Sequence, residues 1–260
     1  MKYENISLSN RGLILVALTI LVTVGVWMAG AIPESGVYHD FADKRYLWGI
    51  PHFLNVISNL PFIIAGIMGL ITVRKAAVPE PLSLIYAVLF TGVWLTGLGS
   101  AWYHLDPDND TLVYDRIPMT IVFMSLLSAT LSEFVSLRLG GILLGPLLII
   151  GVASVLWWHY TETQGAGDLR LYILVQYYPM LLIPMILILF PAAGYRRGVP
   201  QLVRVVIWYV IAKACDLLDR GIYVFTGFIS GHTLKHLAAA AATFYLVRLF
   251  QSKHQSHGAV

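Results

Sequence analysis

Apolar runs of about 20 residues recur along nearly the whole chain, with only short polar connections between them. A helix of this length matches the thickness of the hydrocarbon core of a bilayer. Because lipid offers backbone groups no hydrogen-bond partners, each run is expected to be helical. The pattern predicts eight spans, near residues 12–32, 53–73, 81–103, 117–137, 140–158, 169–190, 202–226 and 232–250.

These spans divide the chain into three segments. Residues 1–50 hold the first span and the loop after it, residues 51–250 hold the other seven spans, and residues 251–260 form a polar tail. The first apolar run is longer than the apolar core of a signal peptide, which has about 7–15 residues. We therefore interpret it as a membrane anchor that is not cleaved. The expected fold class is an all-α integral membrane protein with one helical bundle.

The composition agrees with a membrane location. Of the 260 residues, 58% are hydrophobic and 12% are charged, whereas a soluble domain has about half apolar and roughly a quarter charged residues. The bilayer is therefore the first predicted partner. The formal net charge of +3 is small, and basic residues are usual in the cytoplasmic loops of membrane proteins, so nucleic acid is not an expected partner.

The distribution of charge predicts an orientation. With eight spans, the basic residues gather on one side of the membrane, so the positive-inside rule makes both termini cytoplasmic. A bacterial inner membrane is favoured over the endoplasmic reticulum. Trp157, Trp158 and Tyr160 are interpreted as an aromatic anchor at the outer end of the fifth span. The basic residues that carry the prediction are Lys2, Arg11, Arg74, Lys75, Arg138, Arg196, Arg197, Arg248 and Lys253.

The first candidate for chemistry is the sequence GSAWYH at the outer end of the third span. Ser100 and His104 are four residues apart and share one face of a helix. Asp115 opens the next span just ahead of Pro118, which suits a first helical turn. The connection is short enough for Asp115 to lie opposite His104 at the same membrane depth.

The second candidate is the sequence HTLKH at the start of the last span. His232 and His236 have the i, i+4 spacing by which one helix offers two imidazoles to a zinc ion. His104 is expected at the same outer level and would be the third ligand. Three histidines with one open position form the arrangement by which a catalytic zinc ion holds and activates water.

Each of these residues also has a simpler interpretation. The two histidines of HTLKH could be polar side chains wetted at the membrane interface. Ser100 lies beside Gly97 and Gly99 and could be a small residue at a close helix contact. Asp115 could be a loop carboxylate that pairs with Arg116. The convergence of three histidines, a carboxylate and a hydroxyl at one depth favours the metal site.

Charged residues in the seventh span need partners, because a charge at the bilayer centre costs at least about 2.5–3.5 kcal/mol. Asp216 and Arg220 are four residues apart, so an internal ion pair is the preferred interpretation. The alternative is that Asp219 supports a ligand histidine, because such histidines usually donate their second N–H to a carboxylate or carbonyl group.

Two polar stretches are less informative. His52, Asn55 and Asn59 form a stripe at helical spacing in the second span, and hydrogen bonding between helices is preferred over a headgroup pocket. The run 106–110 has acids at alternate positions, as a calcium loop does, but Thr111 and Ile117 replace the required glycine and glutamate. We interpret this run as an acidic loop outside the cytoplasm.

The sequences GSAWYH, DRIPMT and HTLKH together resemble the alkaline ceramidase family, within a wider group of seven-helix membrane hydrolases. The resemblance extends from about Pro51 to Leu249 and includes PHFLNVISNLPF and LLDRGIY. It implies seven family-like transmembrane helices, so the first span is one extra N-terminal helix. The chain departs from the family's acidic calcium-binding segment, because His52 stands where an acid is expected.

The resemblance also implies roles for five residues. His104, His232 and His236 are expected to bind Zn²⁺, Asp115 to orient or deprotonate water, and Ser100 to help stabilise the oxyanion. The function expected is zinc-dependent intramembrane hydrolysis of the amide bond of ceramide or a related N-acyl lipid, which yields a fatty acid and a long-chain amine. The alternatives are a lipid receptor or binding protein with a structural zinc ion, and a lipid hydrolase that cleaves esters.

Overall fold

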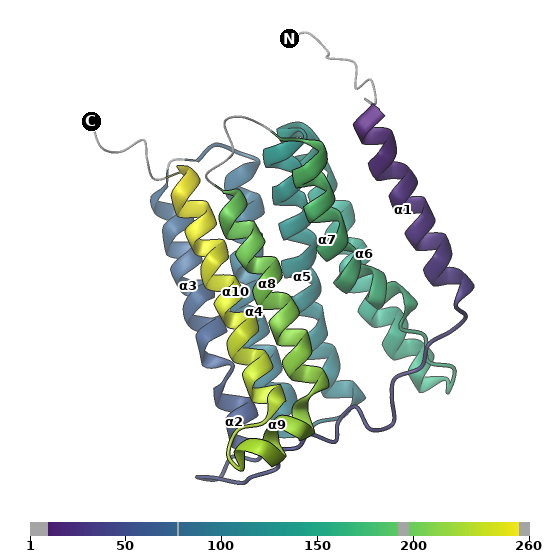
Figure 1. Cartoon of the computed structure of the whole chain (residues 1–260), viewed down its shortest axis with the longest axis vertical. Coiled ribbons are helices and arrows are strands. Elements are labelled where there is room, and N and C mark those ends of the chain that lie inside the picture. Colours follow the sequence, from purple (N-terminus) through teal and green to yellow (C-terminus); the bar gives the residue numbers. More distant parts are fainter. Residues whose placement is uncertain (1–9, 77, 192–197, 255–260) are drawn as a thin grey trace.

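The computed structural model describes residues 10–76, 78–191 and 198–254. Its long helices lie side by side in one bundle (Figure 1), which confirms an all-α membrane protein. The helices are α1 (Asn10–Met28), α2 (Phe53–Ile57), α3 (Leu60–Lys75), α4 (Leu82–Leu105), α5 (Asn109–Phe134), α6 (Leu137–Thr163), α7 (Arg170–Leu189), α8 (Val199–Leu217), α9 (Asp219–Thr226) and α10 (Gly231–His254).

Among the described residues, six spans are long and apolar enough to cross a membrane: α1, α2 with α3, and α4 to α7. α8 and α10 have comparable lengths of 19 and 24 residues and lie in the same bundle (Figure 1). They are less apolar because they carry charged residues such as Lys213, Asp216 and Lys235. These three side chains are at most 28% exposed, so the bundle shields their charges from lipid.

Two predicted helix boundaries are wrong, and both lie near the candidate site. α5 begins at Asn109 rather than near residue 117, because the Asp108 side chain accepts the backbone N–H of Thr111 and caps the helix. Asp115 therefore lies beyond the first turn of α5. The seventh span ends at Leu217, and the short helix α9 follows after a break at Leu218.

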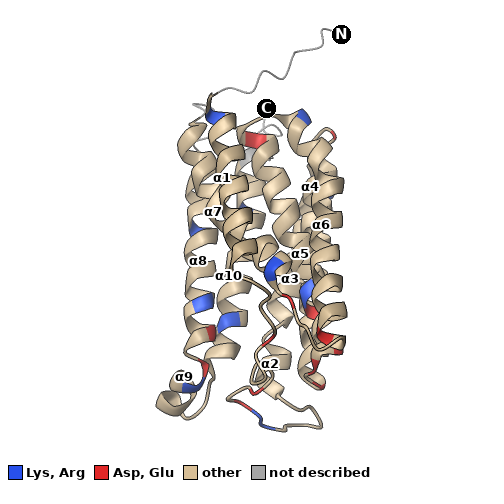
Figure 2. Ribbon diagram, turned by 90° about the vertical axis from the view of Figure 1, so that its right-hand side faces the viewer, with Lys and Arg blue, Asp and Glu red and all other residues tan. Residues whose placement is uncertain are grey.

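The charges are distributed unevenly along the bundle axis. α1 begins and α10 ends at the same end of the bundle (Figure 1), and acidic residues gather mainly at the opposite end (Figure 2). Lys2, Arg196 and Arg197, which contribute to the predicted orientation, lie outside the described residues, as does the segment 255–260 of the predicted tail. α10 continues to His254, so its last turn includes the first residues of that tail.

The extra helix α1 stands at the margin of the bundle (Figure 1). It lies against α7, where the hydroxyl groups of Thr19 and Tyr178 are 2.6 Å apart. Leu15 is its only buried residue among those described, and large apolar side chains such as Leu21 and Met28 are exposed. This exposure suits a helix that meets lipid on most of its circumference.

Candidate metal and catalytic site

Three buried histidines meet where the C-terminal end of α4 approaches the start of α10. The Nε2 atom of His104 lies 3.3 Å from that of His236 and 3.2 Å from that of His232. All three imidazoles are almost fully buried. One nitrogen from each ring lies within 4.8 Å of the other two, so these histidines could hold one metal ion.

Hydrogen bonds on the far side of two rings fix their orientation. His232 Nδ1 lies 3.0 Å from Asp216 Oδ1, and His236 Nδ1 lies 2.8 Å from Ser58 Oγ. The Ser58 hydroxyl donates its hydrogen to the carbonyl of Asn55, so it accepts one from His236. In both rings the proton is thus expected on Nδ1, so Nε2 is the unprotonated nitrogen that can bind a metal ion.

The acidic partner of the site is Asp216 rather than Asp219. The predicted ion pair between Asp216 and Arg220 is wrong, because α8 ends before Arg220 and the Arg220 guanidinium binds Asp40, 2.7 Å away. Asp219 instead accepts backbone N–H groups from Ala42 at 2.9 Å and from His232 at 2.7 Å. It therefore fixes the start of α10 without contacting an imidazole.

Ser100 and Asp115 face each other across α4 and α5. The Ser100 hydroxyl interacts with the Asp115 carboxylate, and both side chains are buried. Gly99 makes this possible, because a Cβ atom there would lie only 2.0 Å from the backbone oxygen of Tyr114. The glycine thus brings the two helices close enough for a serine on one to reach an aspartate on the other.

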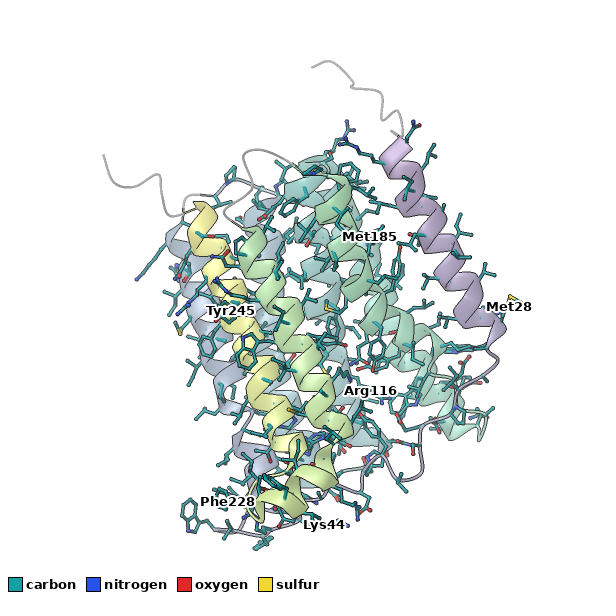
Figure 3. The ribbon with its side chains drawn as sticks, viewed as in Figure 1. Met28, Lys44, Arg116, Met185, Phe228 and Tyr245 are labelled. Atoms are coloured by element: carbon teal, nitrogen blue, oxygen red, sulfur yellow. The ribbon has the colours of Figure 1, made fainter. Side chains whose placement is uncertain are left out.

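Arg116 does not pair with its neighbour Asp115. Its buried guanidinium forms an ion pair with Glu34 of the segment between α1 and α2 and lies 4.1 Å from the centre of the Trp158 ring. Figure 3 shows Arg116 in the same half of the bundle as Lys44 and Phe228. Trp158 is fully buried against this cation, so its prediction as an interfacial anchor is wrong, whereas Trp157 and Tyr160 are exposed.

The polar stripe of the second span connects α2 to other helices. Asn55 accepts a hydrogen bond of 2.7 Å from Thr233 of α10, and His52 Nδ1 lies 3.1 Å from the carbonyl oxygen of His104. Asn59 donates to the carbonyl of Asn55 within its own segment. The preferred interpretation, hydrogen bonding between helices, is confirmed for Asn55 and His52. The sequence pattern missed Ser58, which lies beside this stripe and reaches His236.

The segment 40–45 covers the histidines from outside the bundle. The Phe41 ring packs against His104 and His232, with ring centres 4.7 and 4.4 Å away. Asp43 is fully buried and accepts a hydrogen bond of 2.8 Å from Arg45 Nε. Burial raises the pKa of Asp43, but hydrogen bonds from Arg45 outweigh this effect and hold the pKa below its ordinary value. The segment thus stays anionic at Asp43 and tied to Arg45.

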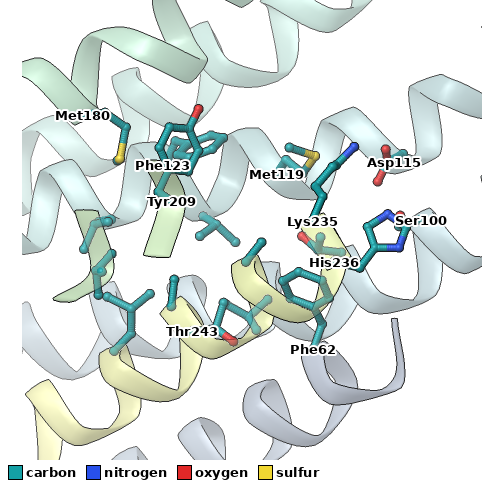
Figure 4. A pocket seen from close by; sticks show the side chains of 18 residues that line it. Phe62, Ser100, Asp115, Met119, Phe123, Met180, Tyr209, Lys235, His236 and Thr243 are labelled. Atoms are coloured by element: carbon teal, nitrogen blue, oxygen red, sulfur yellow. The ribbon is translucent and has the colours of Figure 1, made fainter. Parts of the chain in front are cut away.

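An apolar cavity begins at the site and extends into the bundle (Figure 4). Ser100, Asp115, Lys235 and His236 form its polar end. Its volume is about 110 Å³. The remaining lining is almost entirely apolar and includes Phe62, Val93, Met119, Val122, Phe123, Leu126, Met180, Val205, Ala239, Ala242 and Leu246. The polar end and the apolar lining suit the reactive group of an amphiphile and the part of its chain next to that group.

A comparison with known families identifies the group to which this chain belongs. The family model described as Ceramidase matches residues 40–257, which is most of the chain. The chain belongs to the ceramidase family. Family membership supports an enzyme that hydrolyses the amide bond of ceramide, and it implies a lipid substrate in the membrane. No curated protein matches the chain. In this ceramidase-family protein, α1 lies outside the matched region.

Proposed function

We propose that this protein is a zinc-dependent intramembrane hydrolase that cleaves the amide bond of ceramide or a related N-acyl lipid to a fatty acid and a long-chain amine. The observation that carries the proposal is the convergence of three Nε2 atoms beside a buried serine and aspartate, at the polar end of an apolar cavity. These are the residues that the sequence motifs single out.

The spacing of the nitrogens supports zinc. Zinc bonds of about 2.0–2.1 Å in tetrahedral directions separate two ligand nitrogens by about 3.3 Å. The separations from His104 Nε2 are 3.2 Å to His232 and 3.3 Å to His236. Three neutral imidazoles, two of them oriented by hydrogen bonds from Nδ1, form the donor set of a catalytic zinc site with one open position.

We assign His104, His232 and His236 as the metal ligands, with Asp216 and Ser58 orienting two of them. Bound zinc would supply Lewis-acid activation of water and of the acyl carbonyl group. Asp115 would take a proton from the attacking water and return it to the leaving amine. Ser100 would turn its hydroxyl to the acyl oxygen as negative charge develops there.

The buried position of Asp115 supports this role. Its carboxylate contacts the Ser100 hydroxyl rather than the guanidinium of Arg116, which is bound to Glu34. The carboxylate is therefore not neutralised by its neighbour in sequence. It faces the same cavity as His236, so an acyl carbonyl group at the polar end would lie beside the proton acceptor and the ligands.

We also propose that both termini are cytoplasmic, in a bacterial inner membrane, with the site near the outer face. Arg74 and Lys75 end α3, and Arg138 begins α6, at the end of the bundle where α1 starts. Positive charge at that end favours the cytoplasmic side. A fluorescent protein fused to the C-terminus should then fluoresce in bacterial cells, whereas a fused alkaline phosphatase should be inactive. The reverse pattern would overturn the orientation.

The first test of the function is the metal content of protein purified in detergent without added metal. Plasma mass spectrometry should find about one zinc ion per wild-type chain, a stoichiometry expected for one three-histidine site. The His232→Ala/His236→Ala double variant should contain almost none. Equal, negligible zinc in both proteins would overturn the proposed mechanism.

The second test compares an N-acyl sphingoid base with an ester of the same acyl chain. Release of fatty acid from the amide, lost in the double variant, is the expected result. Preferential cleavage of the ester would identify an ester hydrolase. Zinc and lipid binding without any product after long incubation would identify a receptor or binding protein with a structural zinc ion.

A further inference from the structure

Lys235 places an ammonium group beside the histidines, and the roles assigned above do not use it. It lies on α10 between His232 and His236, and its side chain is 18% exposed. Its Nζ atom lies 3.3 Å from His232 Nε2 and 3.5 Å from Asp216 Oδ1. Figure 4 shows its side chain at the polar end of the cavity, on the same side as Asp115. The amine is therefore adjacent to the reacting groups.

Neutralising Asp216 does not fully explain this lysine. Asp216 already accepts a hydrogen bond from His232 Nδ1 and has a second cation, Lys213, whose Nζ lies 3.8 Å from Asp216 Oδ2. The Nζ atom of Lys213 lies 5.3 Å from the centre of the Tyr177 ring, and Lys213 does not line the cavity. Of these two lysines, only Lys235 can meet a molecule in the cavity, and its ammonium group has three hydrogen atoms to donate.

The charge around the histidines leaves a place for an anion. The carboxylates of Asp115, Asp216 and Asp219 outnumber the cations of Lys213 and Lys235 by one. A divalent ion would change this net charge from one negative to one positive. A site with one excess positive charge among apolar side chains favours an anionic group over a neutral group.

We propose that Lys235 binds the carboxylate of the fatty acid product, and so makes the cavity selective for long-chain carboxylates over neutral lipids of the same length. This inference rests on the proposed function, because hydrolysis of an acyl amide or ester leaves a carboxylate where the carbonyl group was. The apolar walls hold the chain, as in the substrate, while the ammonium group donates a charge-assisted hydrogen bond to the new anion.

The test measures the binding of palmitate and of palmitamide, a neutral molecule with the same chain, to purified full-length protein in detergent. Wild-type protein should prefer palmitate. In Lys235→Met this preference should fall about tenfold or more, because a charge-assisted hydrogen bond is lost, while the affinity for palmitamide changes little. Lys235→Arg should keep most of the preference. Lys213→Met is the matched control, because it removes the other cation near Asp216 but keeps the hydrogen-bond donor in the cavity, so it should lower the preference much less than Lys235→Met.

The metal content and thermal unfolding of every variant are measured in parallel. If Lys235→Met does not fold, Lys235→Gln serves as the neutral variant. An unchanged preference in a folded neutral variant with wild-type metal content would overturn the inference, as would an equal loss in Lys213→Met. The binding measurement requires no turnover. Failure to hydrolyse any amide or ester would therefore count against the proposed function, while the preference for palmitate over palmitamide could still be measured and compared between variants.

Discussion

At the residue scale, Asp216 supports the candidate metal site from behind one ligand. Its carboxylate lies 3.0 Å from His232 Nδ1. Removing such a partner typically lowers metal affinity by about 10–100-fold, because the ring orientation and basicity are lost. Asp216→Ala should show a loss of this size in competition with a zinc-binding dye. Asp216→Asn should lose less, because its amide oxygen can still accept the hydrogen bond.

The matched control for this prediction is Asp110→Ala. Asp110 also binds a histidine, with 2.7 Å between its Oδ1 and His159 Nε2, but its side chain is 80% exposed. Its removal should not change zinc affinity. Equal zinc affinity in wild-type protein and Asp216→Ala would show that the carboxylate does not support the site.

The spacing of histidines along the predicted helices was enough to predict the three candidate metal ligands. The i, i+4 pair His232 and His236 requires only one turn of helix, and His104 meets them because α4 ends at the same depth. The supporting acid was not predictable in this way. The break after Leu217 directs Asp219 to backbone N–H groups and leaves Asp216 facing His232, and a continuous helix pattern contains no signal for that break.

At the element scale, the contact between α4 and α5 depends on Gly99. An added Cβ atom would lie 2.0 Å from the Tyr114 backbone oxygen, so Gly99→Ala must push the helices apart. Overpacking of this kind typically costs about 1–3 kcal/mol. We expect a lower thermal unfolding temperature in detergent and a large loss of hydrolysis, because Ser100 and Asp115 separate. Gly145→Ala on α6 is the control, because nothing lies within 4 Å of its added Cβ atom. Equal effects of the two substitutions would contradict this account.

The segment 40–45 gives a prediction about pH. The pKa of Asp43 is lowered from its ordinary value of 3.8 by its bonds to Arg45, despite burial. Because folding lowers the pKa of Asp43, its ionised carboxylate stabilises this segment at pH values above the ordinary pKa. This stabilisation is lost as the pH falls through the lowered pKa of the folded protein. Hydrogen exchange of the Ala42 amide, corrected for its intrinsic rate, should therefore stay constant from about pH 8 to 5.

Asp43→Asn should accelerate that exchange throughout this range, because the charge is removed at every pH. The Ala42 amide reports on the cover of the site because it donates to Asp219 at 2.9 Å. A corrected exchange rate that increases steeply in the wild-type protein as the pH falls from 8 to 5 would show that another titrating group holds the segment.

At the scale of the whole molecule, the bundle was predictable from apolar runs, but the attachment of its first part was not. Length and hydropathy locate α1, yet they contain no information about which helix it contacts. The structure attaches α1 to α7 and then connects the following loop to α5 through Glu34 and Arg116. Glu34 precedes the region matched by the family model, so this connection is particular to the N-terminal part of the chain.

This connection makes the stability of the bundle depend on Glu34. The side chains of Glu34 and Arg116 are 7% and 4% exposed. Removing one partner of a buried ion pair leaves an uncompensated charge and typically costs about 3–5 kcal/mol. Glu34→Ala should therefore lower the unfolding temperature much more than Asp40→Ala, which breaks the more exposed and better solvated ion pairs with Lys44 and Arg220. Since Arg116 adjoins Asp115, Glu34→Ala should also reduce hydrolysis at temperatures where the protein stays folded. Equal unfolding temperatures for the two variants would show that the bundle does not depend on its N-terminal part.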